Sequence, residues 1–152
     1  MPNDGDSVPN SDHLLRYIDK KYVDSGTGVI DGNGFLARPN EGPPSSNWIE
    51  CFDPPIENQL DNIRAVKRIR YEKRGQLVRI NAGHTIKFVK DSAKGAAPLR
   101  FVHNPLPPMD GKLSDPSHVL MHGIPEGSSS EADLVKDLLR ECIIDVFTPT
   151  LG

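Results

Sequence analysis

Three histidines and two arginines have the residue types that a small enzyme site needs. His103 precedes an Asn-Pro step, and His118 and His122 stand between a proline and a glycine. Imidazole is the side chain most often used for proton transfer near neutral pH, and guanidinium groups bind anions. A loop site that gathers these histidines with Arg16 and Arg38 would suit an enzyme of the hydrolase or transferase type.

Other chemistry fits the spacing of these residues less well. Two strand residues four positions apart, as His118 and His122 would be, lie roughly 13 Å apart along the chain, too far to share one metal ion. Cys51 lies in an apolar run, where a thiol is kept protonated and unreactive. General acid–base catalysis by His103 or His118, with Asp31 or Glu50, stays open. The sequence therefore predicts no metal site and no cofactor.

The charge distribution indicates the function that the sequence favours, a small binding or accessory protein, and the enzyme is the alternative. The chain has a net charge of −3, but the segment 64–94 holds ten Lys or Arg against two acids, a local charge of +8. Such a segment is typical of a surface that binds an acidic partner, or of basic strands that lie beside acidic loops and are neutralised by them. The expected binding residues are Arg68, Arg70, Lys73, Arg74 and Arg79. An acidic protein is favoured over nucleic acid as the partner, since the sequence pI is only about 5.9.

The elements that would carry this charge are predicted as three strands. Residues 66–71 and 76–81 are β-type runs joined by a polar tetrapeptide that ends in Gly75, a hairpin signal. Residues 84–90 alternate Ile86 and Phe88 with lysines, which indicates a third arm. The pattern predicts an antiparallel meander whose central basic hairpin presents the arginines.

The remaining elements complete one α+β domain. Further strands are expected near residues 14–18, 48–52, 99–103 and 117–123, and a short helix over 56–63. An apolar stripe with helical period predicts a C-terminal helix near Glu131–Phe147, packed on one face of the sheet. We expect residues 1–11 to form a disordered leader and 12–150 to form a single domain, with long Pro/Gly-rich loops.

The composition also bears on location. Cys51 and Cys142 are too few for a disulfide scaffold and indicate thiols in a reducing compartment. The N-terminal residues carry no apolar signal segment, and no apolar run approaches the ~20 residues that span a bilayer. A cytoplasmic protein without a membrane interaction is expected.

One resemblance adds to this interpretation. The early glycine-rich turn, and the proline-rich loop and histidine that precede a glycine and the C-terminal helix, are similar to small bacterial proteins of unassigned function. The matching positions are Leu15, Arg16, Gly32, Phe35, Pro105, Pro107, His118 and Gly123. The resemblance implies a bacterial accessory protein and assigns no role to these residues.

Overall fold

The computed structural model describes residues 5–37, 41–66, 68, 70–126 and 129–150 as a six-stranded sheet with three α-helices. All strand pairs are antiparallel, in the order β4-β5-β2-β1-β3-β6. The strands are β1 (His13–Ile18), β2 (Ser45–Trp48), β3 (Gln76–Asn81), β4 (Arg100–His103), β5 (His118–His122) and β6 (Asp145–Phe147). This is the single α+β domain that the sequence predicts.

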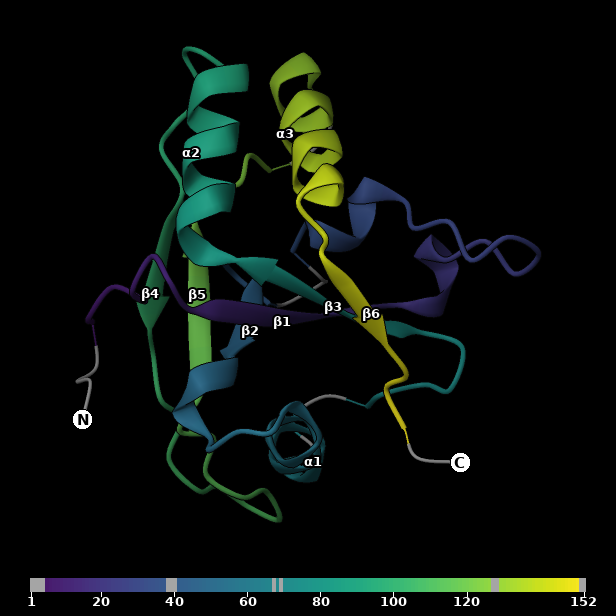
Figure 1. Ribbon diagram of the computed structural model, residues 1–152, viewed down its shortest axis with the longest axis vertical. Coiled ribbons are helices and arrows are strands. Elements are labelled where there is room, and N and C mark those ends of the chain that lie inside the picture. The colour runs from purple at the N-terminus through teal and green to yellow at the C-terminus, as the bar shows by residue number, and fades with distance from the viewer. Residues whose placement is uncertain (1–4, 38–40, 67, 69, 127–128, 151–152) are drawn as a thin grey trace.

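The helices cover both faces of the sheet. Helices α2 (Ala82–Ser92) and α3 (Ser130–Glu141) stand side by side on one face, and α1 (Ile56–Val66) crosses the other (Figure 1). Side chains alternate along each strand, so Leu14 and Ile18 of β1 join the α2/α3 core while Leu15 and Tyr17 join the α1 core. The α2/α3 core is the larger of the two.

The predicted central hairpin is wrong. Val66, the first residue of its first arm, is the last residue of α1, because it continues the apolar stripe of Leu60 and Ile63 by one more turn. Of the rest of that arm, the structure describes residues 68, 70 and 71, and none of these is in a strand. The second arm is β3, as predicted.

The predicted third arm is helix α2. Asn81, expected in a turn, is its N-cap, and its side-chain oxygen accepts a 2.8 Å hydrogen bond from the His84 amide. Thr85 and Val89, four positions apart, are buried on one face, so the strand-like alternation in this short run was misleading.

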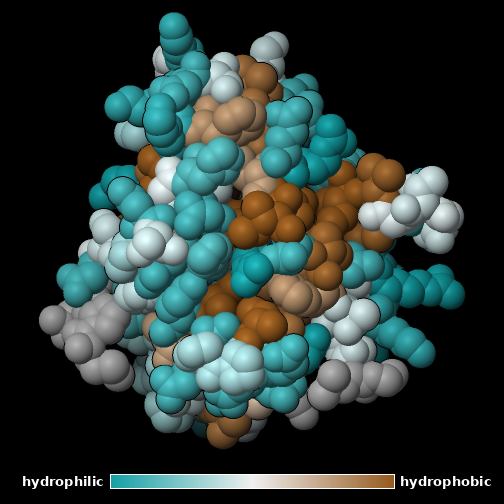
Figure 2. Space-filling model, viewed as in Figure 1, coloured by the Kyte–Doolittle hydropathy of each residue, from teal (hydrophilic) through white to brown (hydrophobic). Residues whose placement is uncertain are grey.

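The C-terminal helix forms but ends earlier than predicted. Helix α3 stops at Glu141, and β6 begins at Asp145 after a short link, in which the Ile144 amide donates to the Arg79 carbonyl at 2.9 Å. Ile143, Ile144 and Val146 are β-branched and favour this extended strand. Figure 2 shows apolar side chains near this join, where Ile144 and Val146 are about half exposed.

The segment expected to be a disordered leader has contacts with the sheet in its described part. Residues 5–8 run antiparallel to β4, and the Val8 amide donates to the Phe101 carbonyl at 3.0 Å. Val8 is also part of the α2/α3 core. Burial of this one valine and pairing with an edge strand hold the segment in place.

Candidate functional site

His118 is held in one orientation by Asn104. Its Nδ1 lies 2.9 Å from the backbone carbonyl oxygen of Asn104 and 3.1 Å from the Asn104 side-chain oxygen. Both oxygens are acceptors, so Nδ1 must carry the proton. In the neutral ring Nε2 is then the atom with the lone pair. Nε2 has no hydrogen-bond partner among the described residues.

A buried carboxylate organises the neighbouring residues. Asp115 is 3% exposed and accepts hydrogen bonds from the Asn47 amide at 3.0 Å, the Ser117 backbone amide at 3.0 Å and the Ser117 hydroxyl at 2.8 Å. Asn47 uses its second amide proton on the Ser117 hydroxyl at 2.8 Å. The side-chain oxygen of Asn47, on β2, is left as an acceptor without a partner in the described part of the chain.

The loop from Leu106 to Asp115 closes over these residues. It is a small hairpin, in which Leu106 pairs with Asp115 and Met109 with Lys112. Arg68, just beyond α1, anchors it by donating to the carbonyls of Leu113 and Pro107. The loop therefore joins the sheet to the end of α1.

Together these elements enclose a cavity of about 230 Å³, here called the α1-side pocket. Its floor is the α1 face of β2 and β5, and its wall is α1 with the segment that follows. It is lined by Ser45, Asn47, Ile63, Val66, Arg68, Tyr71, Leu106, Lys112, Asp115 and His118. The site thus combines an imidazole, an amide oxygen and two cations above an apolar wall.

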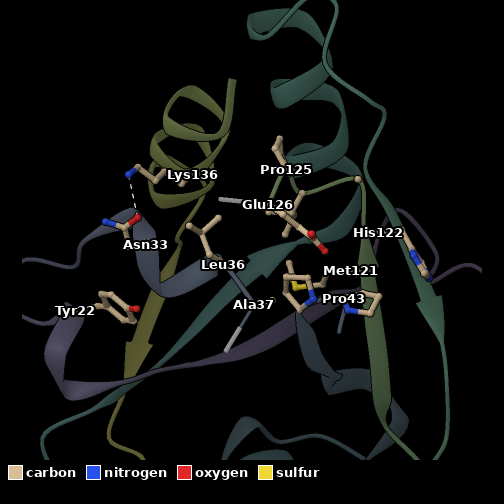
Figure 3. A pocket seen from close by; sticks show the side chains of 13 residues that line it. Tyr22, Asn33, Leu36, Ala37, Pro43, Met121, His122, Pro125, Glu126 and Lys136 are labelled. Atoms are coloured by element: carbon tan, nitrogen blue, oxygen red, sulfur yellow. Dashed lines mark hydrogen bonds between the residues drawn. The ribbon is translucent and has the colours of Figure 1, made fainter. Parts of the chain in front are cut away.

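A larger cavity of about 550 Å³ opens on the other face of the sheet, beside α3 (Figure 3). We call it the α3-side cavity. It lies between the 3-10 helix Gly32–Phe35, the end of β5 and α3, and its polar residues are Tyr22, Asn33, His122, Glu126 and Lys136. Its apolar residues include Leu36, Pro43, Pro44, Met121, Ile124 and Pro125.

The structure separates the residues expected to form one Arg/His site. His118 lines the α1-side pocket and His122 the α3-side cavity. His103 is 4% exposed on the α2/α3 face, where it packs edge-on against Trp48 and donates from Nε2 to the Pro116 carbonyl at 2.6 Å. Arg38 lies outside the described residues.

Arg16 is a buried structural residue. It is 1% exposed and donates to the carbonyls of Gly34, Leu36 and Ser45 at 3.2, 2.8 and 2.7 Å. Its guanidinium also pairs with Glu41 at 2.9 Å. These bonds fasten Gly34, Leu36, Glu41 and Ser45 to β1, so the role of Arg16 is to hold these residues in place.

The predicted basic binding residues have two different roles. Arg68 anchors the loop described above, and Arg79 pairs with Asp145 of β6. Arg70, Lys73 and Arg74 are exposed between α1 and β3. The lysines of α2 lie on the opposite face of the sheet, so the basic segment does not form one continuous surface.

Cys51 and the acidic residues do not form a reactive centre. Burial raises the pKa of the Cys51 thiol from 9.0 to about 12, and the carboxylates of Asp115, Asp12 and Glu50 add to this effect. Within the residues that the structure describes, no three His, Cys, Asp or Glu side chains are grouped as metal ligands.

Sequence reasoning missed the residues that orient His118. Asn47 and Asn104 have ordinary polar side chains in loops or at strand ends, and only the fold brings them to His118 and Asp115. The available signal was the Asp-x-Ser-His string at 115–118, in which Asp115 accepts from the residue two positions later.

No helix of the described part of the chain is both long and apolar enough to cross a bilayer. Comparison of the chain with protein-family models, with curated proteins and with solved structures finds no match, so function has to be argued from the two cavities themselves.

Proposed function

We propose that the protein is a small enzyme of the hydrolase or transferase type whose active site is the α1-side pocket. His118 is the general base and the substrate is anionic. The observation that carries this proposal is the pair of hydrogen bonds from His118 Nδ1 to Asn104, which leaves Nε2 as the proton acceptor of a ring that lines the pocket. A base must present its lone pair in a fixed direction before it can take a proton efficiently.

The charges around the pocket favour an anion. Arg68 and Lys112 stand against the single carboxylate of Asp115, which is already occupied by three hydrogen bonds. Lys112 is exposed, and no ion pair or hydrogen bond engages its ammonium among the described residues. Two cations at the mouth of a partly apolar cavity raise the local concentration of phosphate or carboxylate groups.

The size of the pocket limits the part of the substrate that enters. A volume of about 230 Å³ equals roughly eight water molecules at about 30 Å³ each. This is enough for a phosphate or carboxylate ester group with its attacking water or hydroxyl. The rest of a larger substrate would lie outside, over the Leu106–Asp115 loop.

The roles of the residues follow from their hydrogen bonds. Nε2 of His118 takes the proton of the attacking water or hydroxyl, and the two oxygens of Asn104 stabilise the imidazolium that forms. When the nucleophile is water, it donates its second proton to the Asn47 oxygen, and Asp115 holds the Asn47 amide in that orientation. Lys112 binds the anionic group of the substrate.

The test compares two histidines of the same strand. We expect the protein to hydrolyse p-nitrophenyl phosphate or p-nitrophenyl succinate, and His118→Asn to lower kcat by about a hundredfold or more. His122→Asn is the matched control, because His122 lies outside this pocket and should leave kcat unchanged. Lys112→Met should raise KM for each anionic ester that the parent protein hydrolyses and leave KM for p-nitrophenyl acetate unchanged.

Comparison of the two anionic esters also identifies the anion that the site prefers, since a phosphate-specific site hydrolyses only p-nitrophenyl phosphate. Equal activity of the His118→Asn and His122→Asn variants would contradict the proposal. So would turnover of p-nitrophenyl acetate in preference to both anionic esters.

A second candidate is binding of an acidic protein by the exposed cations Arg70, Lys73 and Arg74. They fall within five residues of one loop, and no ion pair engages them in the described part of the chain. Reversal of all three to Glu should abolish binding to polyglutamate at low salt. The same reversal at Lys87 and Lys90 of α2 and at Lys94, two residues beyond its end, is the control. Equal loss of binding in both triple variants would show a nonspecific charge effect only and reject this site.

A further inference from the structure

The α3-side cavity has a rigid frame that the proposed enzyme site does not use. One wall is the segment with Leu36 and Pro43, which the buried Arg16–Glu41 pair fastens to β1 through the carbonyls of Gly34, Leu36 and Ser45. The backbone is also tied to β5, since the Met121 amide donates to the Pro44 carbonyl at 2.8 Å. A buried charged network therefore sets the shape of this wall.

Two glycines fix the other walls at close approach. A Cβ on Gly32 would lie 2.6 Å from the Lys136 carbonyl oxygen, so the 3-10 helix touches the α3 backbone directly. Gly123, with φ +95°, would place a Cβ 2.3 Å from the Pro98 carbonyl oxygen. Neither position admits another residue without moving the backbone. The cavity is thus preformed, which lowers the ordering cost of binding a ligand.

Opposite charges line the two sides of this cavity (Figure 3). On one side the Lys136 ammonium donates to Asn33 at 2.9 Å and to Asp133 at 2.9 Å. An ammonium has three protons, so one donor remains for a ligand. The hydrogen bond to Asp133 raises the pKa of Lys136, which keeps the group charged.

On the other side is the Glu126 carboxylate, which has no hydrogen bond or ion pair among the described residues. The Tyr22 hydroxyl also lines the cavity, and it has no hydrogen-bond partner in the described part of the chain. Between these polar groups lie Leu36 and Ile124. A ligand that fits must therefore carry a positive charge, a negative charge and an apolar side chain.

We propose that the α3-side cavity binds an apolar zwitterion, a free amino acid or a short peptide with aliphatic side chains. Its carboxylate accepts a hydrogen bond from Lys136, its ammonium pairs with Glu126, and its side chain packs on Leu36 and Ile124. Amino acid and peptide share these three features and differ in length. This site is on the other face of the sheet from His118, so it is independent of the proposed enzyme activity.

The test removes one ligand charge at a time. Leucine and Leu-Leu are titrated into the full chain by calorimetry, followed by N-acetyl-Leu-Leu and Leu-Leu-amide. We expect the better of the two free ligands to bind, and loss of either terminal charge from Leu-Leu to weaken binding by about tenfold. The comparison of leucine with Leu-Leu shows which length the cavity takes. If only leucine binds, N-acetyl-leucine and leucine amide replace the peptide derivatives.

Two substitutions assign the charges to their residues. Glu126→Gln should bind the free and the acetylated ligand with equal affinity and still bind the free ligand more tightly than the amide. Lys136→Met should bind the free ligand and the amide with equal affinity and still bind the free ligand more tightly than the acetylated one. Lys87→Met, on the exposed side of α2, should change neither preference.

The proposal is overturned if leucine and Leu-Leu both fail to bind at 10 mM, or if the acetylated and amidated forms bind as tightly as the free ligand. These outcomes depend on the unchanged protein alone, so a variant that fails to fold cannot obscure them. Neither result bears on the proposed hydrolysis of anionic esters, which concerns the α1-side pocket.

Discussion

Arg16 and His118 lie on opposite faces of the same sheet and differ in how fully their hydrogen-bonding capacity is used. The Arg16 guanidinium donates to three backbone carbonyls and to Glu41, and it is 1% exposed. His118 uses one ring nitrogen on Asn104 and turns a half-buried ring to a cavity. A polar network whose donors and acceptors are all paired holds backbone segments in place. A network with an unpaired donor or acceptor can bind a ligand or take part in a reaction.

The largest expected effect of any substitution comes from opening the saturated network. Glu41→Ala leaves the buried Arg16 charge without its carboxylate, and we expect the free energy of unfolding to fall by about 3–5 kcal/mol. Urea denaturation measures it. Glu126→Ala, which removes a solvent-exposed carboxylate, should change stability by less than about 0.5 kcal/mol.

A loss below 1 kcal/mol for Glu41→Ala would mean that the pair is not a main support of the fold. If Glu41→Ala does not fold at all, the double variant Arg16→Met/Glu41→Leu should recover folded protein, because it removes the unpaired charge.

The second largest effect is expected at Asp115, which belongs to the incompletely used network. Asp115→Ala removes the acceptor of three hydrogen bonds and leaves the Asn47 and Ser117 donors unpaired. We expect a loss of about 2–3 kcal/mol in the same denaturation experiment. Asp110→Ala, at an exposed position in the same loop, is the matched control. If the two variants were equally stable, the hydrogen bonds to Asp115 would not contribute to the stability of the residues around the pocket.

A smaller effect on stability, with a specific spectroscopic signature, is expected at Asn104. Asn104→Ala removes the side-chain oxygen and keeps the backbone carbonyl, so the free energy of unfolding should fall by about 0.5–1.5 kcal/mol. ¹⁵N-edited NMR of the imidazole should show His118 protonated at Nδ1 in the parent protein. In the variant a larger fraction should be protonated at Nε2. An unchanged proportion of the two tautomers would show that the backbone carbonyl alone fixes the ring.

These two networks also show what the sequence could and could not predict. Strands β1, β4 and β5 and the apolar stripes of α1 and α3 follow from local periodicity, and their prediction is confirmed. Helix α2 was missed because seven residues of alternating pattern fit either structure, and its N-cap Asn81 looks like a turn residue. Local signals of this length do not decide between strand and helix.

The candidate site could be predicted only in part, because its partners are distant in sequence. Asn47 and Asp115 are 68 residues apart, and Arg16 and Glu41 are 25 apart. His118 was identified from its residue type and its Pro-rich surroundings. Which histidine is held by an asparagine, and which arginine is buried, depends on strand order and register, and these follow from tertiary packing.

At neutral pH the smallest expected change in stability concerns Cys51, whose sulfur lies 3.8 Å from the carbonyl oxygen of Pro116, the residue after Asp115. Its pKa is near 9 when unfolded and about 12 in the fold. The unfolded chain therefore loses this proton first as the pH rises. The stability associated with the protonated thiol is complete below pH 9 and decreases between pH 9 and 12.

The same shift in pKa lowers the reactivity of Cys51. In a Cys142→Ala background, where Cys51 is the only thiol, the folded protein at pH 8 should contain about a thousandfold less thiolate than the protein in urea. Iodoacetamide alkylation should slow by a comparable factor. Equal rates in the folded and unfolded protein would show that the thiol is ionised in the fold. Cys51 would then be a second candidate, besides His118, for the reactive group. The reactive region would have to include Cys51 as well as the incompletely hydrogen-bonded residues around His118.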